Sequence, residues 1–140
     1  RDNAPVVVVI HEIFGLSGWV RGVADQLAAD GFIAIAPDLL SIERGGATFD
    51  SLPSAEARAL IQRVTPDKMN AMVAAIGQYG MSLPAARRAY GVVGYCWGGS
   101  ASFNHAVFNP PGLKAAVVYY GSSPQAADIA KVRVPVLGLY

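Results

Sequence analysis

Short apolar runs alternate along the chain with longer segments in which apolar residues recur every three or four positions. The runs fall at residues 6–10, 32–36, 90–95, 115–120 and 134–140, and most of their members are Val, Ile, Ala or aromatic residues. Continuous apolar runs of this length are typical of strands that are buried on both faces of a parallel sheet. The segments between them predict crossover helices. The pattern therefore predicts an α/β fold with a mostly parallel sheet and helices on both faces.

The intervening segments carry helix start and stop signals. The clearest start is Thr65-Pro66-Asp67, which combines a capping residue, a proline in the first turn and an early acidic residue. Gly31 and Gly80 are expected to end two of the helices, and residues 41–53, rich in Gly, Ser and Pro, are expected to form an exposed loop. Helices are predicted at residues 17–29 (with Trp19 on the buried face), 54–63, 65–80, 98–108 and 125–131.

Composition narrows the class of protein. The chain has 140 residues, enough for one domain, and 53% of them are apolar while 15% are charged. A chain this apolar can form a buried core, which excludes disorder. A membrane-spanning helix is also excluded, because the run at 6–10 is far shorter than the ~20 residues that span a membrane. A net charge of +1 gives no reason to expect nucleic acid as a partner. The single cysteine excludes an internal disulfide or a CxxC pair, and we expect neither a metal nor a cofactor.

The two ends of the sequence suggest a part of a longer protein. Residue 1 is Arg rather than Met, and the apolar run at 134–140 continues to the last residue without a turn. We therefore expect residues 1–140 to form a single α/β domain that is incomplete, with its beginning and its C-terminal part absent.

The segment with the clearest chemistry is Gly94-Tyr95-Cys96-Trp97-Gly98, which joins a predicted strand to a predicted helix. This Gly-x-Cys-x-Gly pattern is typical of a nucleophile elbow, with Cys where Ser is commoner. The helix N-terminus favours a thiolate at Cys96, and the N–H of Trp97 is placed to stabilise an oxyanion. A lone cysteine is more often a small buried hydrophobic residue, but the flanking glycines favour the nucleophile. A phosphate-binding loop fits less well, because no Gly-Lys-Ser/Thr follows.

A second segment, His11-Glu12-Ile13-Phe14-Gly15, directly follows the first strand. Functional groups of open parallel sheets gather at the carboxyl ends of the strands, so this segment should lie near Cys96. The N–H of Ile13 is the best candidate for a second oxyanion donor. Glu12 is either an acid beside the thiol or a loop carboxylate that faces water. For His11 we expect a structural, hydrogen-bonding role.

His105 does not qualify as the base for Cys96. The two residues lie nine positions apart on one predicted helix, which separates them by ~13 Å along its axis. The base must then come from outside this sequence. Ser100 and Ser102 are expected to be packing or capping hydroxyls.

With these segments in view, the chain resembles the dienelactone hydrolase family of α/β hydrolases. The matching pieces are VVVVIHEIFGL, GFIAIAPDLL and GVVGYCWGGS, in that order, and AAVVYYG and VPVLGLY resemble the next two strands. The resemblance implies a Cys–His–Asp triad with Cys96 as nucleophile, Glu12 as the acid that contacts the thiol, and Ile13 and Trp97 as oxyanion donors. It also implies that Asp38 is not the triad acid, since the triad Asp and His follow the strand at 134–140. Residues 1–140 alone are expected to be inactive.

The predicted function is hydrolysis of a lactone or carboxylic ester of the carboxymethylenebutenolidase type, with a small-molecule substrate and no membrane partner. We expect a cytoplasmic monomer, although an upstream export signal would change the compartment. Two alternatives remain open. A class I glutamine amidotransferase also has Gly-x-Cys-x-Gly at such an elbow, and a catalytically inactive α/β-hydrolase domain could serve only in binding.

Overall fold

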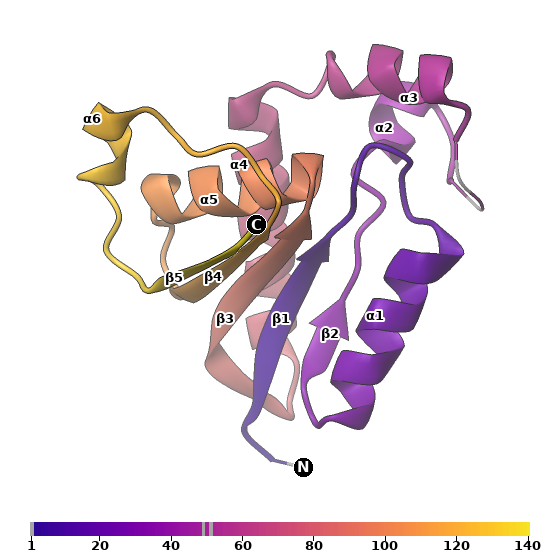
Figure 1. The fold of residues 1–140 in the computed structure, drawn as a ribbon. Coiled ribbons are helices and arrows are strands. Elements are labelled where there is room, and N and C mark those ends of the chain that lie inside the picture. Colours follow the sequence, from indigo (N-terminus) through magenta and orange to yellow (C-terminus); the bar gives the residue numbers. More distant parts are fainter. Residues whose placement is uncertain (1, 49, 51) are drawn as a thin grey trace.

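The computed structural model describes residues 2–48, 50 and 52–140, which form one parallel sheet with flanking helices (Figure 1). The five strands pair in the order β2-β1-β3-β4-β5, and every pair is parallel. This arrangement confirms the predicted α/β class. The strands are β1 (Ala4–Ile10), β2 (Ile33–Ile35), β3 (Ala86–Tyr95), β4 (Leu113–Tyr119) and β5 (Val136–Leu139).

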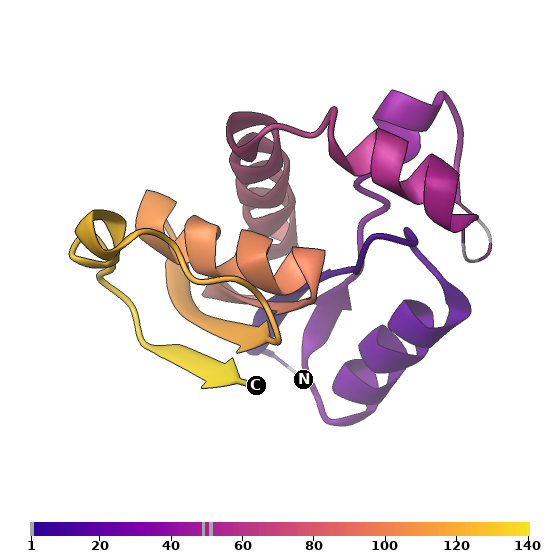
Figure 2. The same ribbon diagram turned by 45° about the horizontal axis from the view of Figure 1, so that its top comes forward.

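Helices flank the sheet on both faces. In Figures 1 and 2, α4 and α5 lie on one face and α1 lies on the other, beside β1 and β2. Within the described ranges, no helix is both long and apolar enough to cross a membrane. The helices are α1 (Gly18–Ala29), α2 (Ser41–Arg44), α3 (Ser54–Ile61), α4 (Pro66–Ser82), α5 (Trp97–Phe108) and α6 (Ala126–Ile129).

The position of β1 inside the sheet, between β2 and β3, explains why apolar and polar residues do not alternate in the first apolar run. Val8 and Ile10 pack in the core cluster that α4 and α5 cover, whereas Val9 packs in a second cluster beneath α1. All three side chains are completely buried. Since consecutive side chains of a strand point to opposite faces, a strand covered on both faces must be apolar at every position.

Two helices differ from the sequence-based predictions. Gly80 does not end α4, which continues to Ser82. A Cβ at position 80 would meet the side chains of Val6 and Ile35, so this glycine lets the helix lie close to the sheet. In α1, Trp19 is 53% exposed rather than buried, and its ring packs edge-on against Tyr95.

The expected exposed loop at 41–53 is in part ordered and buried. Its first turn is the short helix α2, and the side chains of Thr48 and Leu52 are buried. Phe49 and Ser51 lie outside the described residues. Strand β2, predicted over 32–36, has three residues of intermediate exposure because it forms an edge of the sheet.

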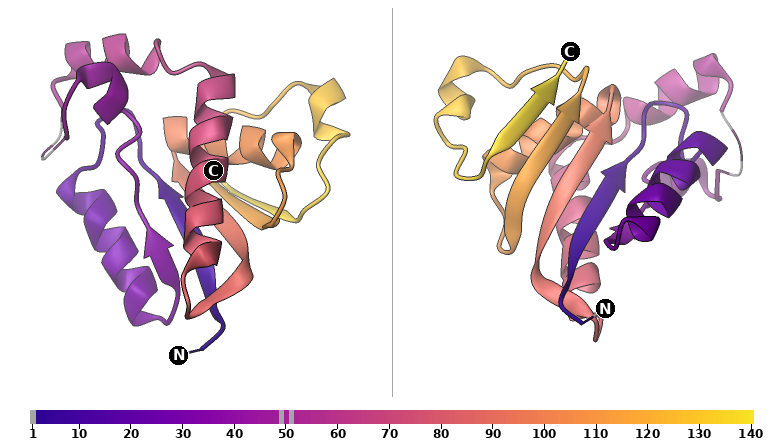
Figure 3. Two further views of the ribbon diagram at one scale, coloured as in Figure 1. Left: turned by 180° about the vertical axis from the view of Figure 1, so that it is seen from behind. Right: turned by 60° about the horizontal axis from the view of Figure 1, so that its bottom comes forward.

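The face that carries α1 is only half covered. Strands β3, β4 and β5 are open to view on this face in the right panel of Figure 3, whereas the left panel shows α4 across the opposite face. An apolar groove of about 530 Å³ follows the open strands. Its lining reaches the carboxyl ends of these strands, at Tyr95, Tyr119 and Leu139.

Candidate active site

Cys96 occupies a strained turn between β3 and α5. Its backbone has φ 56° and ψ −113°, and a positive φ is uncommon for any residue other than glycine. The N–H of Cys96 donates to the carbonyl of Tyr119 at 3.0 Å, which ties the turn to the end of β4. The residue is exposed, which excludes the alternative of a small buried core residue. This is the conformation expected for a nucleophile elbow.

The glycines around Cys96 are required by close backbone contacts. A Cβ on Gly94 would collide with the backbone of Gly98, across the turn. A Cβ on Gly98 would collide with the carbonyls of Ile10 and His11. The elbow therefore packs directly against the end of β1, backbone to backbone, and only glycine permits that approach.

The segment after β1 is held by His11, whose side chain is completely buried. The Leu39 N–H donates to His11 Nε2 at 3.1 Å, so Nε2 carries no proton. Nδ1 then carries the proton and donates to the carbonyl of Glu12 at 2.6 Å. Burial lowers the pKa of His11 below its usual value, which keeps the ring neutral. His11 thus fixes the backbone at Glu12, in the structural role expected from the sequence.

His11 also links this segment to the elbow, because its ring stacks on Trp97 with ring centroids 5.7 Å apart. Ile13 and Trp97 are both half-buried and pack against the core cluster beneath α4 and α5. The structure therefore places the four predicted site residues in two adjoining segments at the carboxyl ends of β1 and β3: Glu12, Ile13, Cys96 and Trp97.

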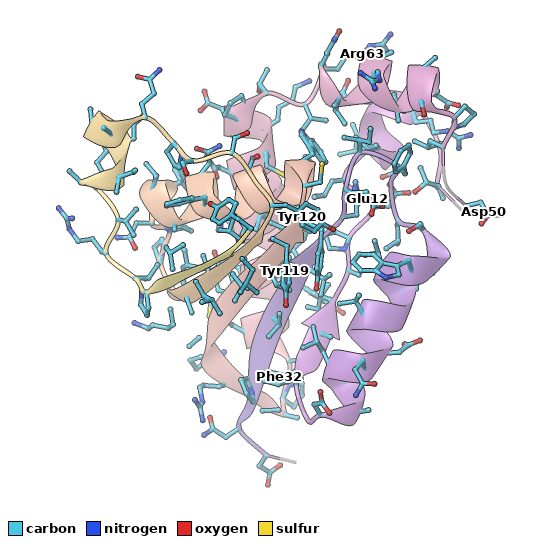
Figure 4. The ribbon with its side chains drawn as sticks, in the orientation of Figure 1. Glu12, Phe32, Asp50, Arg63, Tyr119 and Tyr120 are labelled. Atoms are coloured by element: carbon cyan, nitrogen blue, oxygen red, sulfur yellow. The ribbon has the colours of Figure 1, made fainter. Side chains whose placement is uncertain are left out.

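Glu12 is half-buried, and burial raises the pKa of its carboxyl group. A raised pKa makes a carboxylate a stronger proton acceptor. Figure 4 shows Glu12 and Tyr120 at the same end of the sheet.

Tyr120 is a further residue at this edge of the sheet that the sequence analysis did not select (Figure 4). It follows β4 with φ 39°, and its N–H donates to the carbonyl of Leu139 at 2.7 Å. Desolvation, then the charges of Glu12 and Cys96, raise the pKa of Tyr120, so its hydroxyl lies within the electrostatic reach of both. The sequence analysis placed Tyr120 at the end of the predicted strand 115–120, whereas β4 ends at Tyr119 and leaves Tyr120 at the carboxyl edge of the sheet.

His105 is buried away from the thiol in a polar network. Its ring lies 2.9 Å from the Tyr90 hydroxyl and 3.1 Å from Asn70 Oδ1. Burial lowers the pKa of His105 to about 4. Both ring nitrogens are engaged in the core, in agreement with its exclusion as the base for Cys96.

Asp38 and Thr48 form a scaffold beneath the first loop. The Asp38 carboxylate accepts the N–H of Thr48 at 2.6 Å, and the Thr48 hydroxyl accepts the N–H of Leu16 at 2.9 Å. A side chain on Gly15, which has φ +83°, would meet Thr48. Asp38 therefore holds the backbone of this loop. This agrees with the implication of the resemblance that Asp38 is not the triad acid.

The described residues contain no group of three His, Cys, Asp or Glu side chains that could hold a metal ion.

A parallel sheet with a strained Gly-x-Cys-x-Gly turn between a central strand and the helix that follows it is typical of the α/β-hydrolase class. Within that class, the sequence model of the dienelactone hydrolase family matches residues 1–140. The chain belongs to the dienelactone hydrolase family, which confirms the resemblance noted from its motifs.

Relatives agree with this assignment. An Escherichia coli O157:H7 protein assigned as a carboxymethylenebutenolidase is 34% identical over 97% of this chain and 53% of its own length. Carboxymethylenebutenolidase 1 of Cupriavidus pinatubonensis is 32% identical over 86% of this chain and 52% of its own length. The chain thus spans about half the length of these relatives.

Solved structures show the same fold. A Klebsiella pneumoniae protein assigned to the dienelactone hydrolases superposes with a TM-score of 0.82 at 30% identity, over 99% of this chain and 61% of that one. A dienelactone hydrolase-like promiscuous phosphotriesterase from metagenomic libraries has a TM-score of 0.81 at 24% identity, over 99% of this chain and 57% of its own. The second likeness supports the fold alone.

Proposed function

We propose that the protein hydrolyses a lactone or carboxylic ester through a thioester on Cys96. The observation that carries the proposal is the exposed cysteine in a positive-φ turn at the N-terminus of α5, packed against the end of β1. The names of its relatives, carboxymethylenebutenolidases, support the same reaction class. The family match favours this reaction over that of a glutamine amidotransferase.

The reaction starts when Glu12 accepts the thiol proton and the Cys96 sulfur attacks the ester carbonyl carbon. The N–H groups of Trp97 and Ile13 donate to the oxyanion, and one such donor is typically worth ~10²–10³ in rate. The carbon–oxygen bond of the ester then breaks, and the departing oxygen takes up the proton that Glu12 accepted from the thiol. Water attacks the thioester, which releases the carboxylic acid and restores the thiol.

Deacylation requires a base to activate that water. His11 and His105 both have their ring nitrogens engaged in buried hydrogen bonds. We therefore assign the base and its carboxylate partner to residues that are not among these 140, as the family resemblance implies.

The test compares the complete gene product with its Cys96→Ala variant on p-nitrophenyl acetate and on simple lactones. We expect turnover by the unaltered protein and none by the variant. Equal turnover by both would refute the role of Cys96. Glutamine hydrolysis without ester hydrolysis would favour an amidotransferase, and no turnover together with slow alkylation of Cys96 by iodoacetamide would favour an inactive binding domain.

We further propose that the protein works as a cytoplasmic monomer, since a free catalytic thiol is kept reduced in that compartment. Cell fractionation and size-exclusion chromatography test the two parts of this proposal separately. Recovery of the protein outside the cytoplasm would overturn the first, and elution as a dimer would overturn the second.

A further inference from the structure

A separate cavity lies behind Trp97, between the first turns of α4 and the first half of α5. Its volume is about 200 Å³, smaller than the ~300–1,000 Å³ of sites that hold a whole ligand. It can therefore take one side group of a substrate. No ionisable side chain is among the described residues that line it; the walls include Val64, Met69, Asn70, Trp97, Ser100 and Ala101.

Three polar side chains line this cavity, those of Asn70, Ser100 and Asn104, and contacts in the core orient the amide of Asn70. Burial raises the pKa of Tyr90 to about 12, so its hydroxyl keeps its proton. Asn70 Oδ1 is only an acceptor, so the His105 nitrogen beside it, Nδ1, must carry the ring proton. Nε2 is then unprotonated and accepts from the Tyr90 hydroxyl at 2.9 Å. Tyr90 thus donates a hydrogen bond to His105, and His105 donates one to Asn70.

These two hydrogen bonds leave the amide nitrogen of Asn70 as a free donor. Among residues 2–48, 50 and 52–140, Asn70 Nδ2 has no hydrogen-bond partner. In the same residues, every fully buried side-chain nitrogen or oxygen does have a partner. Nδ2 is therefore accessible, and Asn70 lines the cavity. A fixed donor in a site without charged side chains selects for a ligand that brings an acceptor.

We infer that this cavity is a substrate subsite in which Asn70 Nδ2 donates a hydrogen bond to a neutral oxygen, such as a ketone or second ester carbonyl. The inference rests on the proposed ester hydrolysis, because Trp97 is both a wall of the cavity and the neighbour of Cys96. The preferred substrates are thus esters or lactones with an uncharged acceptor a few bonds from the scissile carbonyl.

Two matched substrate pairs test the subsite in the complete gene product. Methyl 4-oxopentanoate against methyl pentanoate places the extra oxygen in the acyl part, and 3-oxobutyl acetate against butyl acetate places it in the alcohol part. We expect a higher kcat/KM for the oxo member of one pair. The Asn70→Asp variant keeps an acceptor for His105 but removes the donor, and should abolish this preference, a loss of about five- to ten-fold in kcat/KM.

Gln78→Ala is the matched control, because Gln78 is an amide at the far end of α4 and bonds the carbonyl of Pro111. It should keep the preference. Equal loss in Asn70→Asp and Gln78→Ala, or no oxo preference in either pair of the unaltered protein, would overturn the subsite.

A binding measurement separates failure of the subsite from failure of the proposed reaction. In the Cys96→Ala variant, methyl 4-oxopentanoate should shift the side-chain amide NMR signals of Asn70, and methyl pentanoate should not. If the amide shifts while the unaltered protein lacks turnover, the reaction is wrong and the subsite stands. If turnover occurs and neither methyl 4-oxopentanoate nor 3-oxobutyl acetate, titrated in the same way, shifts the Asn70 amide signals, the subsite is wrong.

Discussion

The imidazole of His11 stacks on the indole of Trp97, with an angle of 29° between the two planes. This contact joins the loop after β1 to the elbow after β3. The same imidazole bonds the backbone at Glu12 and at Leu39. One buried neutral ring therefore sets the relative position of the two segments that supply the proposed oxyanion donors, Ile13 and Trp97.

A His11→Phe substitution should keep the stacking and remove the hydrogen bonds. The buried N–H of Leu39 would lose its acceptor, and an unsatisfied buried group costs about 1–3 kcal/mol of folding free energy. Urea unfolding measures this loss, and kcat should fall more than KM rises, because the oxyanion donors shift. Trp97→Phe serves as the comparison, since it keeps the His11 bonds. Unchanged stability of His11→Phe would show that these bonds contribute nothing.

Two glycines of one strand should respond very differently to alanine. At Gly94 the new Cβ would collide with the backbone of Gly98, whereas at Gly91 the nearest atom is the Ala115 carbonyl oxygen at 3.5 Å, an ordinary contact. We expect Gly94→Ala to lose more than about 2 kcal/mol of stability and Gly91→Ala less than about 1 kcal/mol. Thermal unfolding of both variants gives the comparison. Similar losses would mean that the elbow backbone adjusts freely.

The sequence was sufficient to predict the fold class and the backbone geometry of the turn at Cys96, for a physical reason. Both depend on local patterns: apolar continuity reports a strand buried on both faces, and the glycines around Cys96 report backbone crowding. Thr65 was likewise readable, and its hydroxyl accepts the Lys68 N–H at 3.3 Å.

Contacts between distant segments were not readable from the sequence. The burial of Thr48 depends on a hydroxyl that reaches Leu16, 32 positions away, and no local pattern marks it. Gly80 resembled a helix stop because its reason for being glycine, contact with Val6 on another element, is invisible locally. Tyr120 looked like the end of a strand, since its nearness to Glu12 depends on how β4 lies in the sheet.

Glu12→Gln tests whether the carboxylate acts as the proton acceptor for the thiol. The amide fills the same space but cannot accept that proton, so kcat on p-nitrophenyl acetate should fall by about 10²–10⁴-fold with little change in KM. The raised pKa of the Glu12 carboxyl predicts loss of kcat as pH falls, since protonated Glu12 is inactive. Glu12→Asp keeps the charge and should retain part of the rate. A Glu12→Gln variant with unaltered kcat would leave Glu12 as a solvated loop residue.

Thr48→Val should destabilise the loop after β1 while leaving the core volume unchanged. The Leu16 N–H would lose its acceptor at 2.9 Å, with an expected loss of about 1–3 kcal/mol. Thr48→Ser retains the hydroxyl and should recover most of the stability. The measurement is urea unfolding of the three proteins side by side. A Val variant as stable as the parent would indicate that the loop is held by Asp38 alone.

The buried network around His105 should make folding stability depend on pH. Burial lowers the pKa of His105 from 6.5 to about 4 in the folded protein, so between these values the unfolded chain binds more protons. Stability is therefore fully present above about pH 6.5 and decreases as pH falls toward 4, by on the order of 3 kcal/mol in total. Buried His11, whose pKa is also lowered, acts in the same direction.

His105→Gln isolates this effect, because glutamine can bond Asn70 and Tyr90 but does not titrate in this range. Urea unfolding at a series of pH values should give a shallower slope for His105→Gln than for the parent between pH 4 and 6.5, the two limits of the His105 titration. The absolute stability at neutral pH is not the test, since the substitution also alters packing. Equal slopes of stability against pH for His105→Gln and the parent would show that protonation of His105 does not lower the folding stability.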